Sequence, residues 1–216
     1  GLLEQMPPPH TNHRFFGREH EIAALGSHLA RGQHLTILGP AGVGKSGLLQ
    51  AWHRRHPNPA HATYLDLQRA PLSQLLLETL GIPPLPGESH HAWVVRLLEA
   101  CRTRGITRLL LDHIDRAPDV RQMLRVLTTS RLSLVFASRQ SLPEDFGPPF
   151  HLESLPVQDG VALFLDRARL VRPDFEAPQD RVEELVRRLD ALPQALELAA
   201  ARVRIMSISD ILERLE

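Results

Sequence analysis

The stretch at residues 34–55 reads HLTILGPAGVGKSGLLQAWHRR. It opens with HLTIL (34–38), a short apolar run that predicts a buried strand. A glycine-rich segment follows, which predicts a tight loop. From Lys45 the sequence predicts a helix that ends near residue 56, because prolines come next. A strand that runs through such a loop into a helix is the setting in which this type of loop binds phosphate.

The loop fits the pattern G-x-x-x-x-G-K-[ST] over residues 39–46. Gly42 and Gly44 permit backbone conformations that a Cβ atom would forbid, so several N–H groups can turn toward one phosphate chain. The start of the following helix adds partial positive charge. We expect Lys45 to reach the β- and γ-phosphates and Ser46 to bind Mg²⁺. The expected loop ligands are Gly39, Pro40, Ala41, Gly42, Val43, Gly44, Lys45, Ser46 and Gly47.

The composition of the basic residues singles out Lys45. Of the 25 Lys and Arg residues, 24 are Arg, and the one Lys stands inside the loop. A GC-rich coding bias would explain the excess of Arg but not the exception. A compact ammonium fits among phosphate oxygens where a wider, planar guanidinium fits poorly.

A later strand candidate supplies acidic residues. TRLLLDHID (107–115) is an apolar run that carries Asp112 at its C-terminal end, where ligands bind in open α/β sheets. We expect Asp112 to bind Mg²⁺ directly or from the second shell. His113 stands next, where many active ATPases of this architecture carry Glu. His113 or Asp115 could serve as the base, and the alternative, which we favour, is that hydrolysis is slow.

Arg139 ends another strand candidate, LSLVFASR (132–139). Its side chain could reach a γ-phosphate and stabilise charge during transfer. Local sequence alone favours a surface arginine slightly more.

Strand and helix patterns alternate up to residue 155, with further strands predicted at 62–67 and 149–155. The alternation predicts an α/β fold with a mostly parallel sheet and helices on both faces. Only helical patterns follow, and they predict a small all-helical domain. We expect a linker or arm at 1–13, a nucleotide-binding domain at 14–154 and a helical domain at 155–216. The predicted helices after residue 155 cover 157–171, 179–190, 193–206 and 208–215.

Composition excludes several classes of protein. The chain has 25 acidic residues against 25 Lys and Arg, so its net charge gives no general reason to bind nucleic acid. A hydrophobic content of 43% excludes disorder, and no apolar run is long enough for a membrane span. Cys101 is the single cysteine, which excludes an internal disulfide and favours a cytoplasmic setting. We interpret the chain as a piece of a larger protein, since it starts at Gly1 and ends in a helical pattern.

Several segments together resemble the STAND-type signal-transduction ATPases, and most of all their bacterial regulator branch, related to NB-ARC domains. The resemblance covers about residues 14–206 and is most specific where F-x-G-R-E upstream is paired with L-P-x-A-L-E-L-A-A downstream. The segments that carry it are FFGREHEIAAL (15–25), the loop at 39–46, TYLDLQRAPLSQLLLETLG (63–81), LLLDHID (109–115), LVFASRQSL (134–142), LPVQDGVALFLDRA (155–168) and LPQALELAAARV (192–203).

The resemblance implies roles for four residues. Phe16 and Arg18 match a motif that lies beside the adenine in this family. Arg139 matches the sensor arginine that faces the γ-phosphate, which reverses the local preference for a surface arginine. Pro193 matches the proline that packs on the base from the helical domain, which is similar to the ARC1 lid. The family pattern is Gly-x-Pro, whereas this chain has Ala191 at the Gly position, with Gln194 where an apolar residue is usual.

The resemblance also implies a function of the P-loop NTPase (ASCE/AAA+-like) kind. We expect an ATP/ADP-binding switch of a larger signalling or transcription-regulatory protein, with slow Mg²⁺-dependent hydrolysis. ADP would hold the domains closed, and ATP would open them and expose surfaces for a homo-oligomer. A winged-helix domain normally follows, and nothing after residue 206 resembles one. One alternative is an AAA+-type motor or loader acting on DNA, for which a Glu would be expected after Asp112. The other is a pseudo-ATPase that only binds nucleotide. Expected partners are an adenine nucleotide and further domains of the same protein, with neither a membrane nor direct nucleic-acid contact.

Overall fold

A computed structural model covers residues 1–216 and describes all of them except 1–16, 31–33, 56–57, 118–119, 144–145 and 147–148. Within the described residues, five strands form one sheet in the order β2-β3-β4-β1-β5, and every neighbouring pair is parallel. The prediction of a parallel α/β sheet is therefore confirmed. The strands are β1 (Leu35–Leu38), β2 (Ala62–Asp66), β3 (Arg108–Asp112), β4 (Ser133–Ser138) and β5 (Pro149–His151).

Helices cover both faces of this sheet, because its central strands are apolar on both sides. In β4, Leu134 and Phe136 join one hydrophobic cluster, whereas Val135 and Ala137 join another. The first cluster includes residues of α3 (Leu72–Leu80), α4 (His90–Thr103) and α5 (Val120–Thr129), and the second includes residues of α1 (Glu19–Ala30) and α2 (Lys45–Arg55). Continuous apolar strands with a period of two on each face produce this sandwich.

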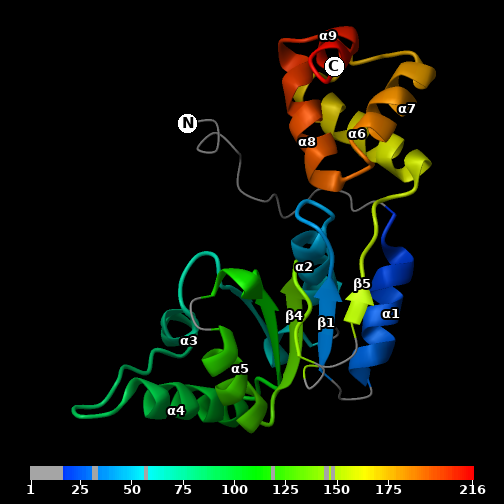
Figure 1. Ribbon diagram of the computed structural model, residues 1–216. Coiled ribbons are helices and arrows are strands. Elements are labelled where there is room, and N and C mark those ends of the chain that lie inside the picture. The colour runs from blue at the N-terminus through cyan, green and yellow to red at the C-terminus, as the bar shows by residue number, and fades with distance from the viewer. Residues whose placement is uncertain (1–16, 31–33, 56–57, 118–119, 144–145, 147–148) are drawn as a thin grey trace.

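The remaining chain forms a helical unit with its own hydrophobic cluster. Its elements are α6 (Val157–Val171), α7 (Gln179–Arg188), α8 (Pro193–Ala201), the 3-10 turn η4 (Arg202–Arg204) and α9 (Ile208–Glu213). The prediction of one helix over 193–206 is wrong at its end, since α8 gives way to η4. Figure 1 shows these helices stacked beyond the C-terminal end of β1, where β1 enters the glycine-rich loop. The helical unit therefore lies next to the predicted phosphate site.

Helix α7 ends in a turn that bears directly on that contact. The Asp190 N–H donates to Arg187 O (3.0 Å) and the Ala191 N–H donates to Val186 O (2.9 Å), which is the paired bonding of a Schellman motif. Asp190 and Ala191 both have positive φ, at 55° and 49°. The family Gly that this chain lacks at position 191 would suit such a backbone. The chain thus keeps the turn geometry, although the side chains of Asp190 and Ala191 make the left-handed conformation sterically unfavourable there.

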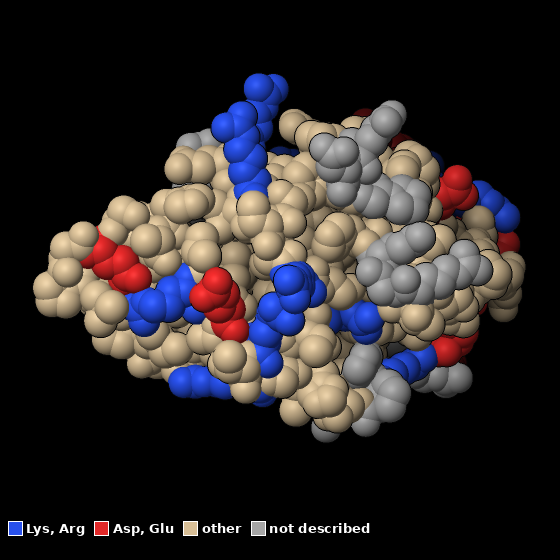
Figure 2. All heavy atoms as spheres, turned by 90° about the horizontal axis from the view of Figure 1, so that it is seen from below, with Lys and Arg blue, Asp and Glu red and all other residues tan. Residues whose placement is uncertain are grey.

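Two surface observations complete the fold. Among the described residues, no helix is both long and apolar enough to cross a bilayer. Figure 2 shows the face at the opposite end of the sheet from the glycine-rich loop, where basic and acidic side chains are interspersed among uncharged ones.

Candidate nucleotide-binding site

The predicted phosphate loop joins β1 to α2, as the sequence indicated. Gly42 and Gly44 have φ values of 80° and 107°, which residues with a Cβ atom rarely adopt. Between them Val43 is fully buried and packs into the cluster beneath α1 and α2. One buried side chain therefore anchors the loop, while Ala41 at its turn is exposed.

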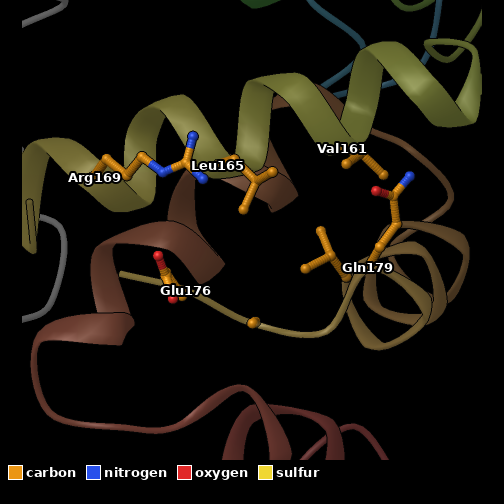
Figure 3. Close-up of a pocket in the computed structure, with 7 residues that line it drawn as sticks. Val161, Leu165, Arg169, Glu176 and Gln179 are labelled. Atoms are coloured by element: carbon orange, nitrogen blue, oxygen red, sulfur yellow. The ribbon is translucent and has the colours of Figure 1, made fainter. Parts of the chain in front are cut away.

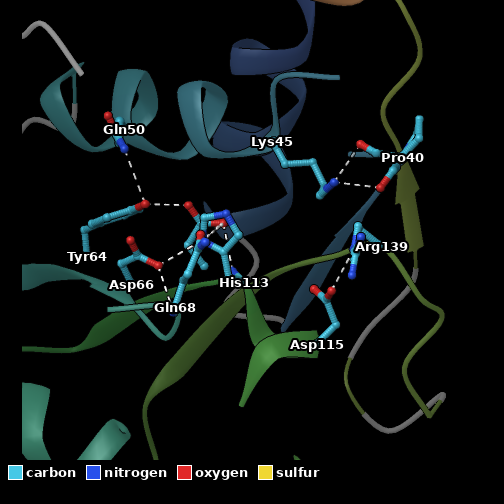
Figure 4. Close-up of polar contacts among 11 residues, drawn as sticks. Pro40, Lys45, Gln50, Tyr64, Asp66, Gln68, His113, Asp115 and Arg139 are labelled. Atoms are coloured by element: carbon cyan, nitrogen blue, oxygen red, sulfur yellow. Dashed lines mark hydrogen bonds and ion pairs between the residues drawn. The ribbon is translucent and has the colours of Figure 1, made fainter. Parts of the chain in front are cut away.

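Lys45 begins α2 and folds back over the loop. Its Nζ donates to Gly39 O (2.6 Å) and to Pro40 O (2.9 Å), as Figure 4 shows. Burial lowers the pKa of Lys45, and the negative charges of Asp115 and Asp112 partly offset this effect. The two carbonyls thus hold the ammonium against the same backbone that would surround a phosphate.

Asp112 ends β3 and is 1% exposed. One carboxylate oxygen accepts the His113 N–H (2.9 Å), and the other accepts the hydroxyl of Tyr64. A carboxylate and a hydroxyl are hard oxygen ligands of the kind that Mg²⁺ prefers. Ser46 lies in the first turn of α2 beside Gly47, and its hydroxyl and the Asp112 carboxylate stay the predicted ligands of the ion.

The two candidate bases both have side-chain partners. His113 has a positive φ of 55°, and its Nδ1 lies 2.8 Å from Asp66 Oδ1, at the end of the neighbouring strand. Asp115 accepts a hydrogen bond from Arg139 Nε (2.9 Å). Burial tends to raise the pKa of Asp115, but hydrogen bonds from the Arg139 side chain and from backbone groups bring it below its usual value. Figure 4 shows both pairs beside the loop; Asp66 ends β2, whereas His113 and Asp115 follow β3 and Arg139 follows β4.

Arg18 contacts the phosphate loop itself. Its guanidinium is 3% exposed and donates to Val43 O (2.7 Å) and to Glu21 (3.4 Å). Burial lowers its pKa, while the charges of Glu21 and of Asp159, on α6, oppose that shift. The residue that the resemblance implied beside the adenine thus supports the loop backbone. Phe16, its expected companion, lies outside the described residues.

The helical unit contacts the loop through the first turn of α8. The Gln194 N–H donates to Gly42 O (3.2 Å), and a Cβ atom on Gly42 would lie only 3.1 Å from Gln194 Oε1. A Cβ on Gly44 would lie 3.6 Å from Pro193 Cγ. Pro193 and Gln194 therefore pack directly on the loop glycines.

Sequence reasoning missed three residues of this site, namely Tyr64, Asp66 and Gln50. Tyr64 and Asp66 are two positions apart in one strand, which places them on the same face, and this was the available signal. The sequence does not say which strand lies beside β2. The register pairs Asp66 with Asp112, and this pairing brings the two acids together.

A hollow lies within the helical unit, between α6 and α7 (Figure 3). Its volume is about 290 Å³, and no residue that lines it is among those that contact the phosphate loop. Leu165 and Val182 give it an apolar wall, and Arg169 and Glu176 add opposite charges. The lining is Val161, Leu165, Arg169, Glu176, Ala177, Gln179 and Val182.

The parallel sheet, with a glycine-rich loop between its interior strand β1 and helix α2, is the fold of a P-loop NTPase, followed here by a small helical unit. Within this class, residues 8–53 match the family model described as Novel STAND NTPase 1. The resemblance to STAND-class NTPases is therefore confirmed.

Curated relatives in mycobacteria extend the similarity along the chain. Uncharacterized proteins of Mycobacterium tuberculosis and Mycobacterium bovis are each 33% identical over 218 residues, which is 92% of this chain and 53% of the relative. A Mycobacterium tuberculosis protein named "Putative HTH-type transcriptional regulator" is 30% identical over 201 residues, which is 87% of this chain and 22% of that protein. The chain thus spans about half the length of the first relatives and a smaller share of the third. The chain is therefore similar to an NTPase family over residues 8–53 and to a segment of a protein named as a regulator.

Proposed function

We propose that the chain is an ATP/ADP-binding switch module of a larger regulatory protein, with slow Mg²⁺-dependent ATP hydrolysis. The observation that carries this proposal is the contact of the α8 turn with the phosphate loop, where Gln194 donates to Gly42 O. A ligand bound by the loop would meet both the sheet and the helical unit. Its phosphates could therefore favour one arrangement of the two parts, to the extent that they bind the arrangements with different affinity.

Arg139 could distinguish ATP from ADP by binding the γ-phosphate. Its partner is Asp115, at 2.9 Å, and the pair is partly exposed. A γ-phosphate carries more negative charge than one carboxylate. It can displace the carboxylate by forming two hydrogen bonds with the guanidinium. ATP, but not ADP, would then compete with Asp115 for Arg139.

Slow hydrolysis follows from the partners of the two candidate bases. An effective base needs a free acceptor within reach of the attacking water. His113 is tethered to Asp66 through Nδ1 and Asp115 to Arg139, so each keeps an acceptor but is held toward its partner, and the position directly after Asp112 carries no carboxylate. The same observation favours, as a second candidate, a pseudo-ATPase that binds nucleotide without hydrolysing it.

The first experiment asks which nucleotide the chain retains. The purified chain is passed through gel filtration and denatured, and the released nucleotide is identified by chromatography and mass. We expect bound ADP, and we expect Lys45→Ala to abolish retention because the loop loses its one ammonium. Arg54→Ala is the matched control, since it removes an exposed cation from the other end of the same helix. Unchanged retention in Lys45→Ala would show that the loop does not hold the phosphates, and fast multiple turnover would contradict the switch.

A further inference from the structure

Tyr64 connects the helix that follows the phosphate loop to the buried acid of β3. Gln50 on α2 donates through Nε2 to Tyr64 Oη (3.3 Å), and the Tyr64 hydroxyl donates to Asp112 Oδ2. Figure 4 shows this chain of contacts beside the Asp66–His113 pair. Three elements, α2, β2 and β3, therefore meet at one phenol oxygen.

The direction of the hydrogen bond is set by its surroundings. Asp112 is 1% exposed, and a buried carboxylate can only accept when it is ionised. A phenol is protonated at neutral pH, and the Tyr64 hydroxyl lies in hydrogen-bond contact with Asp112 Oδ2. Since Tyr64 must donate to Asp112, its oxygen is free to accept from Gln50.

This arrangement fixes the orientation of the Asp112 carboxylate. The other oxygen, Oδ1, accepts the backbone N–H of His113 (2.9 Å), so both oxygens have a fixed donor. Each still has a lone pair for a further partner. A carboxylate held in this way does not lose rotational freedom again when a cation binds.

We propose that Tyr64 is a positioning residue of the magnesium site, which orients Asp112 for the ion while Gln50 holds the phenol in place. The inference rests on the proposed function, because it takes Mg²⁺–nucleotide as the ligand. Partners that orient a metal ligand typically change metal affinity by about 10–100-fold when they are removed. The hydroxyl of Tyr64 is such a partner, and it does not touch the nucleotide in this role.

The test is Tyr64→Phe, which removes one oxygen and keeps the ring. Binding of a fluorescent ADP analogue is titrated with Mg²⁺, and with Mn²⁺ observed by electron paramagnetic resonance. We expect the variant to need about tenfold more of either cation for half-maximal effect. Its affinity for the nucleotide in EDTA should be unchanged. The control is Thr107→Val, which removes an exposed hydroxyl at the other end of the sheet, where Thr107 donates to His61 O.

A second variant, Gln50→Met, removes only the donor that holds the phenol. We expect a smaller rise in the cation requirement, by about two- to threefold, and this variant serves as the test if Tyr64→Phe does not fold. If the wild-type chain binds no nucleotide at all, the proposed function fails. If the wild-type chain binds Mg²⁺–nucleotide and neither variant changes the cation requirement, or either one lowers it, the role of Tyr64 fails and the proposed function stands.

Discussion

Gly160, in the first turn of α6, lies where α6, α7 and α8 of the helical unit meet. A Cβ atom added there would lie 2.7 Å from Val186 Cγ1 and 3.3 Å from Leu196 Cδ1. Carbon atoms of neighbouring side chains normally approach to about 3.5–4.0 Å. The Gly160→Ala variant must therefore push α7 or α8 aside.

The magnitude is a difference between two opposing effects. Alanine favours a helix over glycine by about 1 kcal/mol. Inserting a methyl group into a well-packed core costs about 1–3 kcal/mol. The close approach to Val186 places the cost in the upper part of that range, so after the helix preference is subtracted we expect Gly160→Ala to lower the free energy of unfolding by about 1–2 kcal/mol.

Gly26, in α1, provides the matched control. A Cβ there would meet only Trp52 Nε1, at 4.0 Å, and its φ is not positive. Gly26→Ala should therefore raise the free energy of unfolding by about 1 kcal/mol through helix preference alone. The same substitution is thus expected to have opposite signs in the two helices.

Urea unfolding distinguishes these outcomes. Both tryptophans, Trp52 in α2 and Trp93 in α4, lie in the α/β part, so their fluorescence follows that part, whereas circular dichroism also follows the helical unit. Gly26→Ala should raise the fluorescence midpoint, and Gly160→Ala should lower the midpoint seen by circular dichroism. If Gly160→Ala raised stability as much as Gly26→Ala, the tight packing of α6 against α7 and α8 would be wrong.

Three further predictions concern single contacts. Asp190→Gly should raise the free energy of unfolding by about 1 kcal/mol, because the exposed Asp190 has a left-handed φ that Gly adopts without strain; an unchanged urea midpoint would contradict this. His34 accepts the Leu134 N–H through Nδ1, and burial lowers its pKa from 6.5. Neutral His34 therefore contributes to the free energy of unfolding above pH 6.5, and this contribution should be lost as the pH falls through the lowered pKa. His34→Asn keeps an acceptor but does not titrate, so its free energy of unfolding should change less with pH below 6.5 than that of the wild-type chain. Equal pH dependence in the two chains would refute this. Arg18→Met should weaken nucleotide binding by about tenfold, because Val43 O loses its buried donor, and equal affinities in a nucleotide titration would show that the loop needs no such support.

The regular elements could be predicted from the sequence, because periodicity and glycine or proline signals are local. Helix α6 covers the predicted residues 157–171, and the apolar run before Asp112 forms β3. The loop between β1 and α2 follows from its glycines in the same way. These predictions needed no knowledge of which segments meet in space.

The contacts of the site could not be predicted, because they depend on strand order and on side-chain direction. Tyr64 belongs to no motif, and it reaches Asp112 only because β2 lies beside β3. The family resemblance implies that Arg18 belongs to a motif beside the adenine, and that role stays a prediction, but the contact of its guanidinium with Val43 O could not be read from the sequence. The proposed roles in nucleotide binding and hydrolysis stay predictions until the ligand is identified.

Lys45 has a consequence for chemical labelling. It carries the only side-chain amine in the sequence, and burial lowers its pKa, which leaves more of the amine unprotonated and nucleophilic at a given pH. Apart from the terminal amino group, an acylating reagent has one amine to modify, and that amine lies at the phosphate loop. The rate of modification, followed by intact mass, would report occupancy of the site without any mutation, since a bound phosphate chain should shield the amine.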